Sequence, residues 1–229
     1  MAIDTDVRVP AGQADLAATV VMPVRARGVI VFAHGSGSSR HSPRNRMVAR
    51  ELNHGGYATV LLDLLTPEEE VADRATGRHR FDIGLLGERL CAAIDWAATE
   101  RGLAPLPLGL FGASTGAAGA LLAAATRPRR IGAVVSRGGR PDLAGSALAD
   151  VRAPTLLIVG GEDHEVLLLN REAASVLGPA AQVVVVPGAT HLFSEAGALE
   201  QVTVRAAAWF DTHLDRSGPV LDGLPEVES

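Results

Sequence analysis

Residues 112–116, GASTG, place a serine where it could act as a nucleophile. They follow an apolar run expected to be a strand, residues 106–111, and lead into an alanine-rich run expected to be a helix, residues 115–126. In this context a G-x-S-x-G pattern forms a sharp turn that exposes the serine hydroxyl, and the glycines let strand and helix approach each other. A serine before a helix is also typical of an N-cap, so the pentapeptide alone leaves both interpretations of Ser114 open.

A serine hydroxyl becomes a nucleophile only when a base takes its proton and a carboxylate orients that base. In hydrolases with such a turn the chain order is Ser, then Asp or Glu, then His. His191 follows the last expected strand, residues 182–188, and is the candidate base; Asp163 follows the strand expected at residues 155–161 and is the candidate acid. As alternatives, His191 is a surface residue and Asp163 caps a helix. The other carboxylates considered for the acid are Glu162, Asp142 and Asp150.

The loop after the first expected parallel strand, residues 29–34, is a candidate for part of an oxyanion hole. It reads HGSGSS, and a glycine-rich loop of this kind turns backbone amides inward. The amide of Ser36 or Gly37 is therefore expected to act together with the amide of Thr115. His34 is expected to brace the loop. The alternative is a phosphate-binding loop, but the lysine of a P-loop and the spacing of a dinucleotide-binding motif are both missing.

Alternating strands and helices must position these residues. Six short runs rich in valine, isoleucine and leucine have the composition of parallel strands that are covered on both faces. They lie at residues 29–34, 58–65, 106–111, 131–136, 155–161 and 182–188. Helices are expected between them, at about residues 43–54, 82–101, 115–126, 165–177 and 195–214. With an antiparallel pair expected before the first parallel strand, this alternation predicts a doubly wound α/β fold.

Length and composition favour one α/β domain. The chain has 229 residues, of which 47% are hydrophobic, and we expect a domain over residues 1–214 followed by an irregular tail, residues 215–229. The net charge is -5 and no basic run alternates with aromatics, so we expect no nucleic-acid partner. Cys91 is the single cysteine and is expected to be a buried small side chain. Without a leader or membrane-spanning pattern, the expected location is the cytoplasm.

Four segments, HGSGSS, GASTG, VGGEDHEV and PGATHLF, resemble the α/β-hydrolase superfamily in their order and spacing. The small size without a cap insertion is similar to its dienelactone-hydrolase-like branch, and the resemblance covers roughly residues 15–212. It implies an eight-stranded, mostly parallel sheet with helices on both faces and no large cap domain, and a triad of Ser or Cys, Asp and His acting on esters or lactones. Dienelactone hydrolases proper use cysteine where this chain has Ser114, which favours serine-esterase chemistry over their enol-lactone substrate.

The expected function is hydrolysis of a small carboxylic ester or lactone through an acyl-enzyme, with Ser114, Asp163 and His191 as the triad and no cofactor or metal. Candidate substrate-binding residues come from loops at the carboxyl ends of strands and from the polar insertion at residues 66–81. They are Arg40, Phe81 and Arg137. An acyltransferase with the same triad, or a non-catalytic ligand-binding protein of the same fold, are the alternatives, and the oligomeric state is not predicted.

Overall fold

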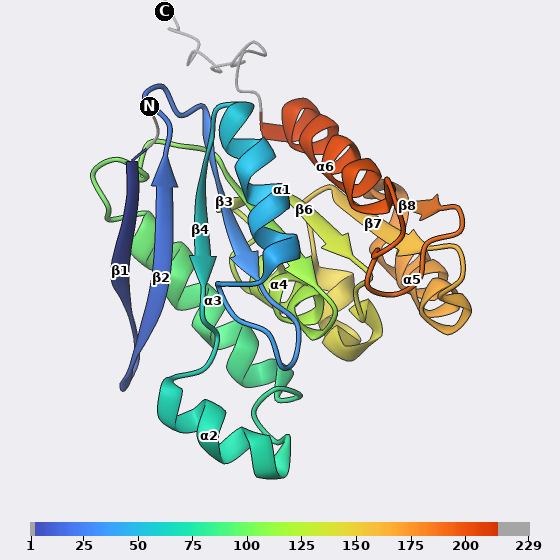
Figure 1. Cartoon of the computed structure of the whole chain (residues 1–229), viewed down its shortest axis with the longest axis horizontal. Coiled ribbons are helices and arrows are strands. Elements are labelled where there is room, and N and C mark those ends of the chain that lie inside the picture. The colour runs from blue at the N-terminus through green and yellow to red at the C-terminus, as the bar shows by residue number, and fades with distance from the viewer. Residues whose placement is uncertain (1–2, 215–229) are drawn as a thin grey trace, which may run out of the picture.

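The computed structural model describes residues 3–214 of the chain (Figure 1). The strands are β1 (Ile3–Ala11), β2 (Ala14–Met22), β3 (Gly28–Ala33), β4 (Tyr57–Leu62), β5 (Leu108–Ala113), β6 (Ile131–Arg137), β7 (Thr155–Gly160) and β8 (Ala181–Val186). The helices are α1 (Pro43–His54), α2 (Pro67–Thr76), α3 (Ile83–Ala97), α4 (Thr115–Thr126), α5 (His164–Leu177) and α6 (Ala198–Leu214), with 3-10 segments η1 (Pro141–Asp150) and η2 (Gly178–Ala180). None of these helices is long and apolar enough to cross a membrane. The expected tail lies outside the described residues.

All eight strands form one sheet, in the order β1-β2-β4-β3-β5-β6-β7-β8. β2 pairs antiparallel with β1 and with β4, and every other neighbouring pair is parallel. The expected α/β fold with a mostly parallel eight-stranded sheet is confirmed, and no cap domain stands on the described part of the chain. The apolar runs expected to be parallel strands are β3 to β8, and the expected antiparallel pair is β1 with β2.

The sheet carries a hydrophobic core on each of its faces. α3, α4 and α5 pack on one face, and α1 and α6 cover the other (Figure 1). Within β5, Leu108 and Leu110 belong to the first core and Phe111 to the second. Every residue of β3, β4, β5 and β7 is buried, because both faces of these strands are covered.

The polar insertion at residues 66–81 contains a helix, α2, that hydrophobic periodicity does not predict. The Thr66 hydroxyl accepts a hydrogen bond from the Glu69 amide at 3.3 Å, and the Glu69 carboxylate accepts one from the Thr66 amide at 2.8 Å. This capping box, with Pro67 as the first helical residue, begins the helix without an apolar stripe. The spacing of Thr66 and Glu69 is the sequence signal for α2.

The parallel strands end at one edge of the sheet, and the loops that follow them meet there. α2 stands beyond the ends of β3 and β4, at the lower end of the molecule in Figure 1. Open α/β sheets bind their ligands at the carboxyl ends of strands. The fold therefore brings the residues after β3, β5, β6, β7 and β8 to the edge where a site is expected.

Candidate active site

Ser114 occupies the tight turn between β5 and α4. Its backbone dihedrals are φ 51° and ψ -124°, a region that residues with a side chain rarely adopt. The flanking glycines allow this turn, because a Cβ on Gly112 would lie 2.4 Å from Cα of Ala117, and one on Gly116 would lie 2.4 Å from the carbonyl oxygen of His34. A strained serine between two closely packed glycines is the local geometry expected of a nucleophile turn.

The Ser114 side chain does not cap α4, although the residue stands at the N-cap position. Within the described chain its hydroxyl receives no capping hydrogen bond, whereas Ser42 and Thr66 cap α1 and α2 in the ordinary way. The backbone holds the turn instead: the Ser114 amide donates to the Arg137 carbonyl at 3.3 Å, and the Ser114 carbonyl accepts from the Arg140 amide at 3.1 Å. The N-cap interpretation therefore does not account for this serine.

His191 and Asp163 come together at the carboxyl ends of β8 and β7. Nδ1 of His191 lies 2.6 Å from Oδ2 of Asp163, so the ring N–H donates to the carboxylate. This bond favours the tautomer with the proton on Nδ1 and leaves Nε2 as an acceptor. Asp163 stands at the N-cap of α5, but its side chain makes no capping hydrogen bond. The carboxylate is directed to the histidine rather than to the helix.

Glu195 closes the loop that carries His191. Its carboxylate accepts hydrogen bonds from the Thr190 hydroxyl at 2.6 Å and from the Thr190 amide at 3.1 Å. These bonds, above all the one from the hydroxyl, lower the pKa of Glu195. Phe193, in the same loop, is buried and has a φ of 54°, an unusual value for a bulky residue. Sequence patterns did not indicate this role of Glu195, because it depends on how the loop folds back on itself.

Ser114 and His191 line the same cavity, which has a volume of about 240 Å³. Ser36, from the loop after β3, also lines it. Thr115 is the first residue of α4, so the helix does not use its N–H group, which can donate to a ligand. The amides of Ser36 and Thr115 thus come from the two segments that are expected to supply oxyanion donors.

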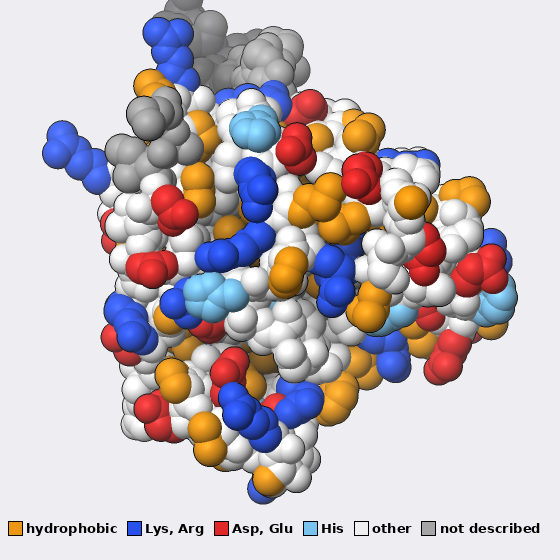
Figure 2. Space-filling view, viewed as in Figure 1, with side chains coloured by type: hydrophobic (Ala, Val, Ile, Leu, Met, Phe, Trp, Pro, Cys, Tyr) orange, Lys and Arg blue, Asp and Glu red, His pale blue; other side chains and the backbone are white. Residues whose placement is uncertain are grey.

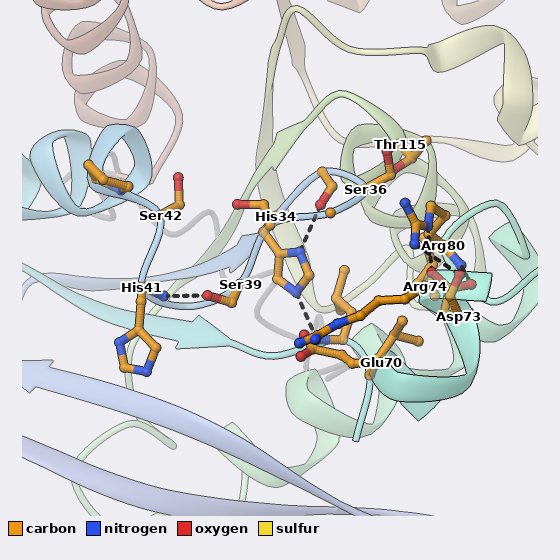
Figure 3. A pocket seen from close by; sticks show the side chains of 17 residues that line it. His34, Ser36, Ser39, His41, Ser42, Glu70, Asp73, Arg74, Arg80 and Thr115 are labelled. Atoms are coloured by element: carbon orange, nitrogen blue, oxygen red, sulfur yellow. Dashed lines mark hydrogen bonds and ion pairs between the residues drawn. The ribbon is translucent and has the colours of Figure 1, made fainter. Parts of the chain in front are cut away.

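A larger cavity of about 490 Å³, shown in Figure 3, adjoins the first, because residues of the HGSGSS loop line both. Ser36 lines both cavities, whereas Gly37 and Thr115 are found only in the lining of the larger one. Its far wall is formed by α2, through Glu70 and Arg74 among other residues. The HGSGSS loop therefore has a cavity on either side of it.

His34 braces the HGSGSS loop, as expected. Its Nε2 accepts a hydrogen bond from the Leu64 amide at 3.0 Å, so Nδ1 carries the proton and donates to the Gly35 carbonyl at 2.9 Å (Figure 3). Burial lowers the pKa of His34, which favours this neutral ring. Both ring nitrogens are occupied, which leaves His34 no lone pair for service as a second base.

Of the three candidate substrate-binding residues, Arg137 lines the cavity that contains Ser114, and the other two lie outside both cavities. Arg40 forms an ion pair with Asp63, which also accepts a hydrogen bond from the Arg40 amide at 2.6 Å. Phe81 is 60% exposed. Arg137 is buried at the end of β6, where strand pairing places it next to the start of the serine turn.

The rival carboxylates do not approach His191. Asp142 is paired with Arg140 at 2.7 Å, and a carboxylate oxygen of the exposed Glu162 lies 3.9 Å from Nε2 of His164. Asp150 is exposed at the end of η1. Among the alternatives considered, Asp163 is therefore the carboxylate that the fold brings to His191.

The sequence and the fold of this chain are similar to those of known proteins. The sequence model of the dienelactone hydrolase family matches residues 16–213. The crystal structure of a dienelactone hydrolase from Anabaena variabilis is 51% identical, with a TM-score of 0.91 over 93% of this chain and 99% of that chain. A dienelactone hydrolase-like promiscuous phosphotriesterase from metagenomic libraries is 16% identical, with a TM-score of 0.78 over 93% of this chain and 99% of that one, which shows the shared fold.

Two curated relatives, from two strains of Mycobacterium tuberculosis, are each 56% identical to this chain over 216 residues. They are named as proposed phosphoribosyl transferases. The match covers 94% of this chain and 48% of each relative. The chain thus spans about half the length of the curated relatives that it matches.

Proposed function

The chain belongs to the dienelactone hydrolase family, and on this premise we propose that it is a serine hydrolase that cleaves a small carboxylic ester or lactone. The observation that carries the proposal is the 2.6 Å contact between His191 and Asp163, with His191 and Ser114 in one cavity. A candidate nucleophile, a candidate base bonded to a carboxylate, and two candidate amide donors lie at the carboxyl edge of the sheet, which is the set that acyl transfer requires. Ser114 stands where dienelactone hydrolases proper have a cysteine nucleophile, so the chemistry that we propose is that of a serine esterase.

In the proposed mechanism Nε2 of His191 takes the proton of the Ser114 hydroxyl as its oxygen attacks the substrate carbonyl. The amides of Thr115 and Ser36 stabilise the negative charge on the carbonyl oxygen of the tetrahedral intermediate. The protonated His191 then gives its proton to the departing alcohol, which leaves the acyl group bound to Ser114. Water attacks this acyl-enzyme with the same assistance, the acid departs, and the Ser114 hydroxyl is restored. Asp163 orients the neutral ring and stabilises the imidazole whenever it carries the extra proton.

The Mycobacterium tuberculosis relatives that carry the phosphoribosyl transferase name are about twice as long as this chain, whereas the family model that matches this chain is one of hydrolases. A serine and a histidine that line one cavity, with Asp163 bonded to the histidine, are suited to attack on a carbonyl carbon, and we assign this chemistry to residues 16–213.

Replacement of Ser114 tests the proposal. We expect Ser114→Ala to lower kcat/KM for para-nitrophenyl acetate by about 10³-fold or more and to abolish labelling by a fluorophosphonate, because the attacking oxygen is removed. Ser175→Ala, an exposed serine on α5, is the matched control and should keep both activity and labelling. A folded Ser114→Ala protein that keeps its label or near-normal turnover would refute the assignment.

A further inference from the structure

Two arginines line the cavity that contains Ser114 and His191. Arg137 comes from the end of β6 and is 7% exposed; Arg44 comes from the first turn of α1 and is half-buried. The Nε atoms of both are buried and have no hydrogen-bond partner within the described residues. A guanidinium group has five N–H donors, and burial without partners is costly for it.

Neither arginine is neutralised by a carboxylate of residues 3–214. Arg40, Arg80 and Arg140, which lie in neighbouring loops, each have an aspartate partner. The Arg137 guanidinium group donates a long hydrogen bond to Oδ1 of Asn45, at 3.4 Å. Its guanidinium carbon also lies 5.9 Å from the centre of the Phe193 ring.

The electrostatic surroundings of this pair favour an anion. Burial, and after it the positive charge of Arg44, lowers the pKa of Arg137 to about 10, so the side chain stays charged at neutral pH. Figure 2 shows basic side chains gathered over α1, in the middle of the face that this helix covers, although the net charge of the chain is -5. A bound carboxylate or phosphate would offset the repulsion between the two guanidinium groups and supply the missing acceptors.

The position of His191 indicates which half of an ester would carry the anion. His191 must protonate the departing alcohol, so the alcohol oxygen has to lie within hydrogen-bond reach of its ring. Within the described structure His191 lines the cavity with the two arginines and is absent from the lining of the larger cavity, where Thr115 and Gly37 lie. The alcohol part is therefore directed towards Arg44 and Arg137, and the acyl part towards the larger cavity.

We propose that Arg44 and Arg137 form a binding subsite for a small anionic group, a carboxylate or phosphate, on the alcohol part of the substrate. The inference rests on the proposed esterase function. The cavity of about 240 Å³ would then select esters that carry a negative charge on the alcohol part over neutral esters and over esters that carry the charge on the acyl part.

Four acetate or succinate esters of phenols separate the possibilities. Phenyl acetate is neutral, para-acetoxybenzoate and para-acetoxyphenyl phosphate carry a carboxylate and a phosphate on the alcohol part, and monophenyl succinate carries its carboxylate on the acyl part. Arg137→Met and Arg44→Met remove the charge and keep most of the aliphatic packing. Arg46→Met changes an exposed arginine of the same helix and is the matched control. For each ester, the ratio of variant to native kcat/KM cancels the intrinsic reactivity of the ester.

We expect each of the two variants to lose about tenfold to hundredfold in kcat/KM on at least one of the two esters with an anionic alcohol part, as the loss of a charged hydrogen bond implies. Whichever of these two esters shows the larger loss identifies the anion as carboxylate or phosphate. Phenyl acetate and monophenyl succinate should change less than about twofold by the same reasoning, and Arg46→Met should change none of the four.

Three results would overturn the subsite: equal losses on all four esters, a selective loss on monophenyl succinate, or no loss on any. Binding without turnover gives an independent measurement. Para-hydroxybenzoate or inorganic phosphate should raise the Tm of the native protein and of Ser114→Ala, and should not raise that of Arg137→Met. If no ester is hydrolysed but the anions raise the Tm, the esterase proposal fails and the anion subsite stands. If esters are hydrolysed but neither anion raises the Tm, the esterase proposal stands and the anion subsite fails.

Discussion

Ser114 is held in a backbone conformation that lowers the stability of the fold. Its φ of 51° and ψ of -124° lie in a region that glycine enters easily and other residues enter at a cost of about 1–3 kcal/mol. The backbone is closely packed on both sides of Ser114, since a Cβ on Gly112 or on Gly116 would lie 2.4 Å from a neighbouring backbone atom. The strain keeps the hydroxyl at the carboxyl edge of the sheet, where it faces the cavity lined by His191.

From this strain we predict that Ser114→Gly is more stable than Ser114→Ala by about 1 kcal/mol, because glycine adopts the turn without steric cost. Urea denaturation of the two inactive variants measures the difference. The same pair of substitutions at Ser175, inside α5, is the control and should give the opposite sign by about 1 kcal/mol, since glycine is the poorer helix former. A Ser114→Gly protein no more stable than Ser114→Ala would mean that the turn is unstrained.

Individual site residues were predictable where they follow a strand and belong to a known sequence pattern. Both conditions hold for Asp163 and His191, and Oδ2 of the one lies 2.6 Å from Nδ1 of the other. Their catalytic roles stay predictions. Arg44 was missed because it lies in a helix, and it reaches the cavity only through the way α1 packs on the sheet. Arg40 was selected as a substrate-binding residue, but its ion pair with Asp63, a residue just after β4, depends on tertiary contacts that spacing does not show.

At the scale of elements, α2 is attached to the fold by polar contacts rather than by an apolar face. Its capping residue Glu69 accepts hydrogen bonds from Arg89 of α3 at 2.6 and 2.7 Å, and Arg89 also donates to the Leu64 carbonyl at 3.1 Å. The Arg89 side chain is 7% exposed and that of Glu69 is 25% exposed. The ion pair between Glu69 and Arg89 therefore holds the start of α2 in place. It thereby also positions the wall that α2 forms in the larger cavity.

We predict that Glu69→Gln lowers the free energy of unfolding by about 1–3 kcal/mol at neutral pH, because it leaves the buried Arg89 without its counter-charge. Burial by itself would raise the pKa of Glu69, but the hydrogen bonds from Arg89 and from the Thr66 amide lower it below the ordinary value of 4.5. A depressed carboxylate pKa stabilises the folded state above the pKa of the unfolded chain, and this contribution is lost as the pH falls through the folded-state pKa.

The stability difference between the native protein and Glu69→Gln should therefore be constant near neutral pH and shrink on acidification below about 4.5. Urea denaturation over a pH series measures it. Glu68→Gln, an exposed neighbour on the same helix turn, serves as the control and should differ from the native protein by less than about 1 kcal/mol at every pH. A difference that grows on acidification would contradict the ion-pair explanation.

The sequence predicts the helices that bury an apolar face. It does not predict a helix that lacks such a face. α1 and α4 coincide with the expected residues 43–54 and 115–126. α2 has Asp73 as its buried residue, so no hydrophobic stripe marks it in the sequence. α6 begins at Ala198 rather than at 195, because Glu195 is bonded to Thr190 in the preceding loop.

At the scale of the whole molecule, one sheet lies between two hydrophobic cores, one on each of its faces. Trp96, on α3, packs against the core on one face, and Trp209, on α6, packs against the core on the other. These are the two tryptophans of the chain, so each variant with one of them replaced by phenylalanine reports on a single face. The strand side chains alternate between the faces, and loss of either core would uncover the strands that support the other.

We therefore predict that damage on one face destabilises the opposite face equally. In a Trp209→Phe background, where Trp96 alone fluoresces, Phe210→Ala on α6 should lower the free energy of unfolding reported by Trp96 by about 3–5 kcal/mol. Far-UV circular dichroism should give the same midpoint, because all residues of a cooperative unit unfold together. Val204→Ala, an exposed residue of α6, is the control and should leave the midpoint nearly unchanged. If Phe210→Ala lowered the circular dichroism midpoint while the Trp96 signal stayed in place, the two faces would unfold as separate units.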